Sequence, residues 1–390
     1  MREIELNSRE ELILEKLLEL KKRSGSHSPS VNSLLEKIPE IKFKVDACFL
    51  SNPYATQLFL DYFEKEVLKG NKIREMLEYY PSQNNVIAEK LASFIGVDVE
   101  NVFIGNGAIE IIQAIIHNFT KSKIIINIPT FSSYYEFVKP EVEVVYNKLL
   151  KKNDFNLDVE SYIELIKKEK PDTIVLINPN NPNGGYLKGE QMFKIMKAAR
   201  DVENVIVDES FIHFAYENSN YDFVSVTEFI SNFPNLIIIK SMSKDFGIAG
   251  IRAGYAVMSK ERSKLLLENG YLWNSNGLAE YFFKLYTQAK FAYNYQKVRI
   301  KYIIETNEFI KQIKQIKEIK VYPTMANFLL IELPEKVDLD RFTLMLLIRY
   351  GIYVRNANDK IGLEGNFIRV ASRSYEENKY MIKVFKKIFN

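Results

Sequence analysis

The sequence has few of the residues that build disulfide bonds or metal centres. Cys48 is the single cysteine, so an intrachain disulfide and a cysteine-based zinc site are both excluded. Only three histidines are present, which argues against a histidine-rich metal centre. Long apolar runs are missing too, and the charged N-terminus lacks the continuous apolar core of a signal peptide. We therefore expect a cytoplasmic protein without a bound metal ion.

An excess of one charge is also absent. The net charge is +3 over 390 residues, and the 26 phenylalanines and 23 tyrosines are scattered rather than grouped with lysine and arginine. A protein that tracks a nucleic-acid strand needs such grouping, so neither nucleic acid nor membrane is an expected partner. The chain is too long for one small core, and two domains are expected.

Strand-like and helix-like segments alternate from about residue 85. Apolar runs such as KIIINIP (123–129) and TIVLINP (173–179) are separated by helical stretches. Continuous Ile and Val runs with helical crossovers are typical of a largely parallel sheet that is buried on both faces. The pattern therefore predicts an α/β fold, with a large domain over 76–290 and a smaller α+β domain over 291–390.

The N-terminal part is predicted to contribute to the smaller domain. Residues 41–75 are expected to join that domain, and residues 1–40 to form a helical extension with a polar linker at 23–33. Ser8 and Glu11 stand at capping-box spacing before an amphipathic pattern, which predicts a helix over 8–22.

Lys244 lies in the most informative segment, SMSKDFGIAGIRAGYAV (241–257). A lysine after a strand is usually a solvated strand end. This one follows two serines on a glycine-rich turn, and Arg252 comes shortly after it. Such an arrangement suits an amine that holds a carbonyl cofactor beside the cofactor's phosphate. The segment resembles the S-x-S-K and R-x-G-Y signature of the class I/II aminotransferases, fold-type I enzymes that use pyridoxal 5'-phosphate.

Three further residues match that family in the same order along the chain. Asp208 ends the apolar run NVIVD, where an unpaired charge is costly, and the resemblance makes it the partner of the protonated pyridine nitrogen. Asn181, in an Asn-Pro turn, matches the donor to the cofactor's phenolate oxygen. Phe131 matches the aromatic residue that stacks on the ring. A turn-capping aspartate and a core phenylalanine are the simpler alternatives.

A glycine-rich turn is the candidate phosphate cradle. The sequence IGNGAIEII leads from a strand directly into a helix, which exposes backbone N–H groups to an anion. The serine and aspartate side chains usual in the family are missing there, so the backbone must do more of the binding. The resemblance assigns the cradle to Gly107, Ala108, Ile109, Ser241, Ser243 and Arg252.

Tyr80, in YYPSQNN, resembles the family's tyrosine that reaches the phosphate bound by the neighbouring subunit. The resemblance therefore implies a homodimer with shared active sites.

Within the family, the chain resembles the branch of histidinol-phosphate aminotransferases and threonine-phosphate decarboxylases, from about residue 45 onward. Phe211 stands where aminotransferases usually have a tyrosine, and Arg373 matches an arginine of the decarboxylases. An alternative role for Arg373 is structural. The resemblance assigns substrate binding to Arg355, Arg369, Asn52 and Asn181.

These matches predict decarboxylation of a small O-phospho-amino acid of the threonine phosphate or serine phosphate type. Arginines that bind the substrate determine the reaction by fixing the substrate's orientation, because the bond that stands perpendicular to the cofactor ring is the one that breaks. The alternative is transamination of a phosphorylated amine such as histidinol phosphate. A transcription regulator would need a DNA-binding module that one N-terminal helix does not supply. A non-catalytic scaffold is disfavoured because Lys244 and Asp208 are both present.

Overall fold

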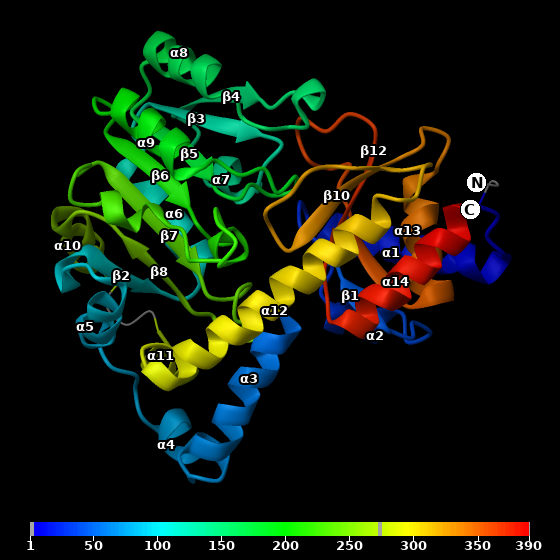
Figure 1. The fold of residues 1–390 in the computed structure, drawn as a ribbon, viewed down its shortest axis with the longest axis horizontal. Helices are drawn as coiled ribbons and strands as arrows, with labels where there is room; N and C mark the ends of the chain where they lie inside the picture. Colours follow the sequence, from blue (N-terminus) through cyan, green and yellow to red (C-terminus); the bar gives the residue numbers. More distant parts are fainter. Residues whose placement is uncertain (1–3, 272–274, 390) are drawn as a thin grey trace.

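The computed structural model describes residues 4–271 and 275–389, which form two β-sheets surrounded by helices (Figure 1). The larger sheet has the strand order β2-β8-β7-β6-β5-β3-β4, and the smaller one β1-β11-β12-β10-β9. The larger sheet comprises β2 (Val102–Gly105), β3 (Lys123–Ile128), β4 (Glu143–Lys148), β5 (Thr173–Ile177), β6 (Asn204–Asp208), β7 (Leu236–Ser241) and β8 (Gly254–Val257). The smaller sheet comprises β1 (Val45–Ala47), β9 (Lys320–Val321), β10 (Phe328–Leu333), β11 (Ile352–Asn356) and β12 (Asn366–Ala371).

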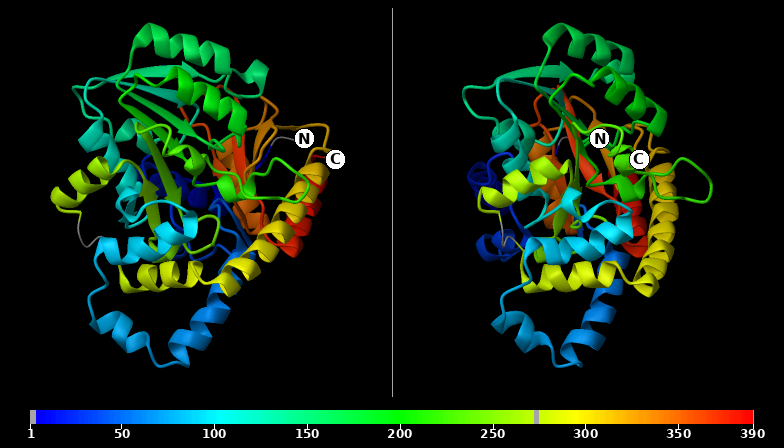
Figure 2. Two further views of the ribbon diagram at one scale, coloured as in Figure 1. Left: turned by 60° about the vertical axis from the view of Figure 1, so that its left-hand side comes forward. Right: turned by 90° about the vertical axis from the view of Figure 1, so that its left-hand side faces the viewer.

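Helices occupy both faces of the larger sheet and flank the smaller one (Figures 1 and 2). The α-helices are α1 (Ser8–Arg23), α2 (Val31–Lys37), α3 (Pro53–Phe63), α4 (Ile73–Glu78), α5 (Asn84–Ile95), α6 (Ala108–Phe119), α7 (Ser133–Glu136), α8 (Val159–Glu169), α9 (Gly189–Ala198), α10 (Lys260–Glu268), α11 (Gly277–Tyr286), α12 (Ala289–Ile313), α13 (Leu339–Tyr350) and α14 (Tyr375–Phe389).

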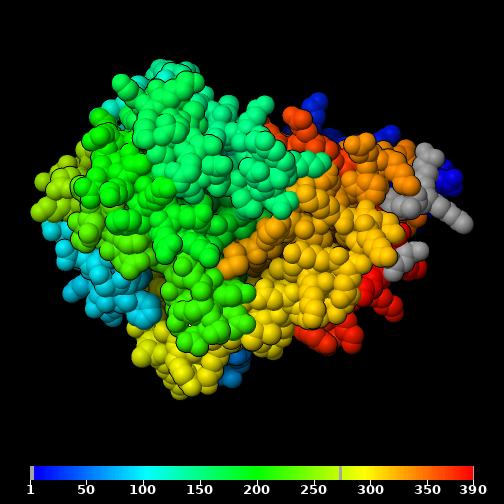
Figure 3. All heavy atoms as spheres, turned by 45° about the horizontal axis from the view of Figure 1, so that its top comes forward, coloured from blue at the N-terminus to red at the C-terminus, as the bar shows by residue number. Residues whose placement is uncertain are grey.

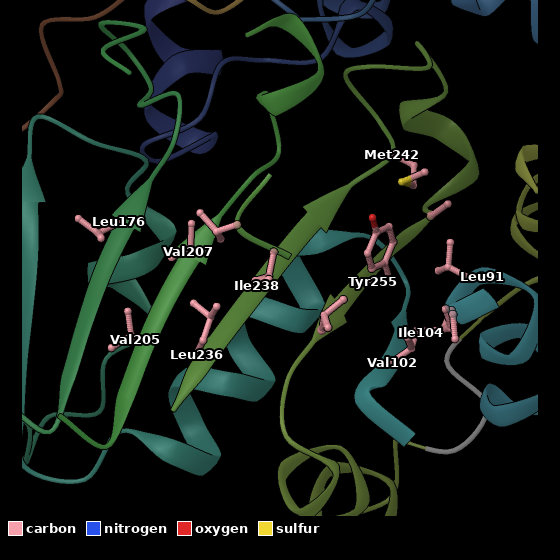
Figure 4. Packing of buried hydrophobic residues seen from close by; sticks show 14 of the residues in the cluster. Leu91, Val102, Ile104, Leu176, Val205, Val207, Leu236, Ile238, Met242 and Tyr255 are labelled. Carbon is pink, nitrogen blue, oxygen red and sulfur yellow. The ribbon is translucent and has the colours of Figure 1, made fainter. Parts of the chain in front are cut away.

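The larger sheet is mostly parallel because helices connect its central strands. Strands β4, β3, β5, β6 and β7 run parallel, whereas β8 is antiparallel to both β7 and β2. Side chains on one face pack with α5, α8, α9 and α11, and those on the other face with α6, α7 and α10. Figure 4 shows part of the first cluster, with Leu176, Val207 and Ile238 side by side on neighbouring strands. This double burial explains the continuous Ile and Val runs of the sequence.

The two ends of the chain meet in the smaller sheet. Strand β1 pairs in parallel with β11, so the segment after α2 becomes an edge strand of the C-terminal sheet. The long helix α12 extends from the larger sheet to the smaller one (Figure 1). The surfaces of the two regions meet in Figure 3, green against orange. The predicted α/β fold is confirmed, and the domain limits at 40, 75 and 290 remain predictions.

The N-terminal extension is folded rather than a helix with a loose linker. Helix α1 begins at Ser8 as predicted, but the predicted capping pair was wrong: Asn7 accepts from the Glu10 amide, and the Glu10 carboxylate accepts from the Asn7 amide. The cap lies one residue earlier because Asn7 has the extended backbone that a cap requires. Helix α2 occupies the end of the predicted linker at 23–33. Within residues 4–271 and 275–389, no helix is long and apolar enough to cross a membrane.

An ion pair between a buried glutamate and an exposed arginine attaches the extension to the rest of the protein. Both carboxylate oxygens of Glu10 accept from the Arg349 guanidinium on α13, each at 2.7 Å. Glu10 is only 7% exposed, and the hydrogen bond to Arg349 lowers the pKa of its carboxyl. A two-pronged pair of this kind is stronger than an ordinary surface ion pair.

Glu10→Ala is expected to loosen α1 from α13, because it removes both bonds to Arg349 and the second half of the helix cap. Trypsin cleavage at the end of α1, after Lys21, Lys22 or Arg23, should accelerate by about tenfold, since local opening becomes easier. Glu15→Ala on the exposed side of the same helix is the matched control. Equal cleavage rates for the two variants would contradict the role given to the Glu10–Arg349 pair.

Candidate active site

A cavity of about 250 Å³ opens where three parallel strands of the larger sheet end. Ile177, Asp208 and Ser241, the last residues of β5, β6 and β7, line it. The carboxyl ends of parallel strands are the usual ligand-binding edge of such sheets. The cavity also contains most of the predicted site: Ala108, Ile109, Phe131, Asn181, Phe211, Ser243, Lys244, Arg252, Arg355 and Arg369.

Lys244 is held by its backbone at the turn after β7. Its carbonyl oxygen accepts from the Asn52 amide at 3.1 Å and from the Gly247 amide at 3.3 Å. Burial, with the positive charges of Arg369 and Arg252, lowers the pKa of the Lys244 amine to about 8. An amine with such a pKa is partly neutral near neutral pH, and a neutral amine is the form that attacks a carbonyl carbon.

Asp208 is a buried carboxylate that accepts two hydrogen bonds. Its Oδ2 accepts from the Tyr134 hydroxyl at 2.8 Å, and its Oδ1 accepts from the Ser210 amide at 2.8 Å. Burial raises the pKa of the Asp208 carboxyl above its ordinary value, although these hydrogen bonds oppose the rise. A cationic ring nitrogen at the cavity would favour the ionised form. Tyr134 was missed from the sequence, where it follows Phe131 in the same turn.

The predicted phosphate cradle has the tight backbone that an anion needs. Gly107 has φ +84° at the start of α6, and a Cβ there would lie 2.6 Å from the Arg252 guanidinium. A Cβ at Gly254 would lie 2.8 Å from the Ala108 amide nitrogen. The Ser243 amide donates to the Ser241 hydroxyl at 3.3 Å. First-turn amides of α6, two serines and one arginine fit the phosphate group of pyridoxal phosphate.

The predicted substrate arginines line the cavity from β11 and β12 of the smaller sheet. Arg369 donates to the Asn181 side-chain oxygen at 2.7 Å and to the Cys48 carbonyl at 2.8 Å, while its Nε is buried without a hydrogen-bond partner. Arg355 donates to the Ser26 carbonyl at 2.8 Å and forms an ion pair with Asp359. Both guanidinium groups are therefore held in place before any ligand arrives.

Four of the singled-out residues do not line this cavity: Gly107, which shapes the cradle through its backbone, and Asn52, Arg373 and Tyr80. The side-chain oxygen of Asn52 caps α3 by accepting from the Tyr54 and Ala55 amides, and its Nδ2 is buried without a partner. Arg373 donates to the Ser51 carbonyl at 2.8 Å, so its visible role is structural. Tyr80 is 92% exposed.

Two parts of the cavity wall were not found from the sequence. Ser26, His27 and Ser28, in the short segment between α1 and α2, line the cavity, and the His27 ring lies 6.0 Å from the Phe131 ring. Lys360 lines it from the loop between β11 and β12. The first 40 residues lie outside the family resemblance, and no motif marks Lys360. In the described part of the chain, no three His, Cys, Asp or Glu side chains are grouped so that they could hold a metal ion.

Comparison with known proteins yields related enzymes over almost the whole chain. The family model described as aminotransferase class I and II matches residues 51–385. The chain is 55% identical over 386 residues to the L-serine phosphate decarboxylase of Campylobacter jejuni, covering 99% of each chain. A solved structure of a decarboxylase from Sulfurospirillum multivorans is 45% identical, with a TM-score of 0.94 and 98% of each chain covered. A histidinol-phosphate aminotransferase of Thermoanaerobacter is 32% identical over 330 residues, covering 83% of this chain and 87% of the other.

Gly107→Ala is expected to weaken binding of pyridoxal phosphate by at least about tenfold, because the new methyl group displaces the Arg252 guanidinium and strains a left-handed backbone. Titration of the cofactor-free protein, followed by visible absorbance, measures the affinity. Gly250→Ala is the matched control, since no atom lies within 4 Å of its added Cβ and its φ is not positive. Unchanged affinity in Gly107→Ala would contradict the assignment of the cradle.

Proposed function

Because the chain belongs to the aminotransferase class I and II family, we propose that it is a pyridoxal-phosphate-dependent decarboxylase of a small O-phospho-amino acid. The family and the related decarboxylases use pyridoxal phosphate. O-phospho-L-serine is the preferred candidate substrate, as the name of the Campylobacter jejuni relative suggests.

The observation that carries the proposal is a buried amine between two groups of cations. Lys244 lines one cavity together with Arg252 at the cradle and with Arg355 and Arg369 from the smaller sheet. The positive charges of Arg369 and Arg252 both lower the pKa of the Lys244 amine, so the amine interacts electrostatically with both groups of cations. One anion site suits the cofactor's phosphate, and the other suits the phosphate of a substrate that reacts at the amine-bearing carbon between them.

The cavity residues have distinct roles in holding the cofactor. Lys244 would bind its aldehyde carbon, and the Asp208 carboxylate, supported by Tyr134 and Ser210, would pair with the pyridine nitrogen. Phe131 would supply the aromatic contact to the ring. Asn181 has its side-chain oxygen occupied by Arg369, which leaves its Nδ2 to donate to the phenolate oxygen.

The reaction replaces the substrate's α-carboxylate with a proton. When bound, pyridoxal phosphate accepts the electron pair that remains as the α-carboxylate leaves as CO₂. Asp208, as a carboxylate, stabilises positive charge at the ring nitrogen and so favours this uptake. The Lys244 side chain, in its protonated ammonium form, then delivers a proton to the α-carbon, which yields the amine phosphate.

Substrate orientation selects decarboxylation over transamination. Arg355 and Arg369 would bind the substrate's phosphate and so fix the orientation in which its α-carboxylate is presented for cleavage. Phe211 lines the cavity and packs edge-on against Phe328, with ring centroids 5.2 Å apart, and it has no hydroxyl for the phenolate oxygen. The Ser26–Ser28 segment closes one side and excludes water, which favours a small substrate.

We further propose that the enzyme works as a homodimer in which Tyr80 serves the partner's site. Tyr80 is 92% exposed and absent from the wall of its own cavity, which supports a role outside its own subunit. Leu77 and Tyr79 beside it are 78% and 67% exposed, so the surface around Tyr80 is apolar enough for a protein interface.

Transamination of histidinol phosphate is the second candidate, favoured by the 32% identity to the Thermoanaerobacter aminotransferase. It requires a keto acid as second substrate.

The purified enzyme is expected to release CO₂ from O-phospho-L-serine without any keto acid. Lys244→Ala should lower this rate by at least about a hundredfold, because both the amine that holds the cofactor and the proton donor are lost. Lys264→Ala, at an exposed position of α10, is the control. Turnover that depends on 2-oxoglutarate and releases no CO₂ would establish transamination instead.

Mixed dimers test whether active sites are shared. Lys244→Ala and Tyr80→Ala subunits are each expected to be impaired at limiting cofactor. After unfolding and refolding together at equal amounts, about a quarter of all sites should combine an intact Lys244 with an intact Tyr80 from the other subunit. Activity should recover accordingly, measured as CO₂ release. Without recovery, Tyr80 does not act across the interface.

A further inference from the structure

Lys360 is a buried cation of the active-site cavity that the proposed reaction leaves unused. It lies in the loop between β11 and β12 and is 7% exposed. Its amide donates to the Ala357 carbonyl at 3.0 Å, and its carbonyl accepts from the Leu363 amide at 3.1 Å. These two hydrogen bonds fix the backbone of Lys360 in the loop. Its side chain lines the cavity together with those of Arg355 and Arg369.

No carboxylate forms an ion pair with the Lys360 ammonium among the described residues. Its one hydrogen bond is to the Ser132 hydroxyl, at 3.4 Å. Asp359, the nearest in sequence, is paired with Arg355, and Glu136 is exposed to solvent. A buried ammonium without a counter-ion is costly. Burial and the charge of Arg355 accordingly lower the pKa of Lys360 to about 8.

The strand register concentrates the positive charge at this wall. Arg355 on β11 is the direct cross-strand partner of Arg369 on β12, and like charges in such positions repel. With Lys360 there are three cations, and Asp359 neutralises one of them. Two positive charges remain uncompensated. A phosphomonoester carries about two negative charges near pH 7.5, whereas a sulfate ester or a carboxylate carries one.

The Ser132 hydroxyl that meets Lys360 also lies 2.9 Å from the Ser26 hydroxyl of the N-terminal segment. Ser26 in turn accepts from Arg355 through its carbonyl. Lys360 and Arg355 are therefore both anchored, directly or through Ser132, to the segment that closes the cavity. Their ammonium and guanidinium groups are held ready for one ligand group.

We propose that Lys360 is the specificity-determining residue that makes this wall selective for a phosphomonoester dianion over a monoanion of the same shape. The inference rests on the proposed function, in which Arg355 and Arg369 seat the substrate's phosphate. Lys360 supplies the second positive charge at this wall. The second negative charge of a phosphomonoester pairs with it, whereas a carboxylate or a sulfate ester has no such charge.

The test compares O-phospho-L-serine with L-serine O-sulfate on the holoenzyme. Lys360→Met keeps most of the side-chain length and removes the charge. It is expected to raise the KM for O-phospho-L-serine by at least about tenfold while kcat changes by less than about threefold. Inhibition by L-serine O-sulfate should weaken by less than about threefold. Lys360→Arg should restore most of the affinity for the phosphate ester. Lys379→Met, at an exposed position of α14, is the control.

Two outcomes overturn the inference. One is a KM for O-phospho-L-serine in Lys360→Met within about twofold of the wild-type value. The other is an equal loss for the phosphate and sulfate esters, which would mean that Lys360 only shapes the cavity. Lys360→Gln serves as a second neutral variant if Lys360→Met does not retain the cofactor, as judged from visible absorbance.

Calorimetric binding of inorganic phosphate to the holoenzyme separates this inference from the proposed reaction. A wild-type enzyme that releases no CO₂ from O-phospho-L-serine would contradict the reaction. If Lys360→Met nevertheless weakens inorganic phosphate by about tenfold, the dianion site stands and serves another phosphate ester. If phosphate binds equally to both forms, the inference fails even when decarboxylation is observed.

Discussion

The gathering of positive charge around a small buried cavity is the constraint on which the rest of the site depends. Among the residues that the structure describes, five lysine and arginine side chains line the cavity but a single carboxylate, that of Asp208. Such an arrangement is unfavourable in the protein alone, because each buried cation loses hydration and repels the others. It becomes favourable when anions occupy both ends. In the proposed enzyme, these charges would be compensated by a phosphorylated cofactor and a phosphorylated substrate.

Strand ends, a hydrogen-bonded turn and strand pairing hold the charged groups of the cavity in fixed positions. Strand ends deliver Asp208 and Ser241, a turn closed by Asn52 holds the Lys244 backbone, and the antiparallel pairing of β11 with β12 places Arg355 beside Arg369. Polar contacts from distant segments complete the arrangement, such as the Tyr134 hydroxyl on the Asp208 carboxylate. Since these groups are ordered before binding, little conformational entropy is lost when a ligand arrives.

Local sequence patterns were sufficient for the sheet and for the residues that follow its strands. Ile and Val runs predicted buried parallel strands, and Lys244, Asp208 and Asn181 each come at or just after such a run. The capping pair of α1 was displaced by one residue, because asparagine and serine both cap well and spacing alone does not choose between them. The closing segment at Ser26–Ser28 could not be predicted, since its place on the cavity depends on α1 docking onto α13 through Glu10 and Arg349.

The sequence by itself determined the fold class, the family resemblance and the order of the cofactor-binding motifs, because these follow from short-range periodicity and from residue types at strand ends. Only the tertiary structure decided which charged groups share one cavity. Lys360 looked like an ordinary loop lysine, yet it is buried beside Arg355 and Arg369, while Arg373 was placed against the Ser51 carbonyl. Electrostatic environment depends on distances through space, and segments more than 200 residues apart along the chain, such as those of Ser132 and Lys360, create it here.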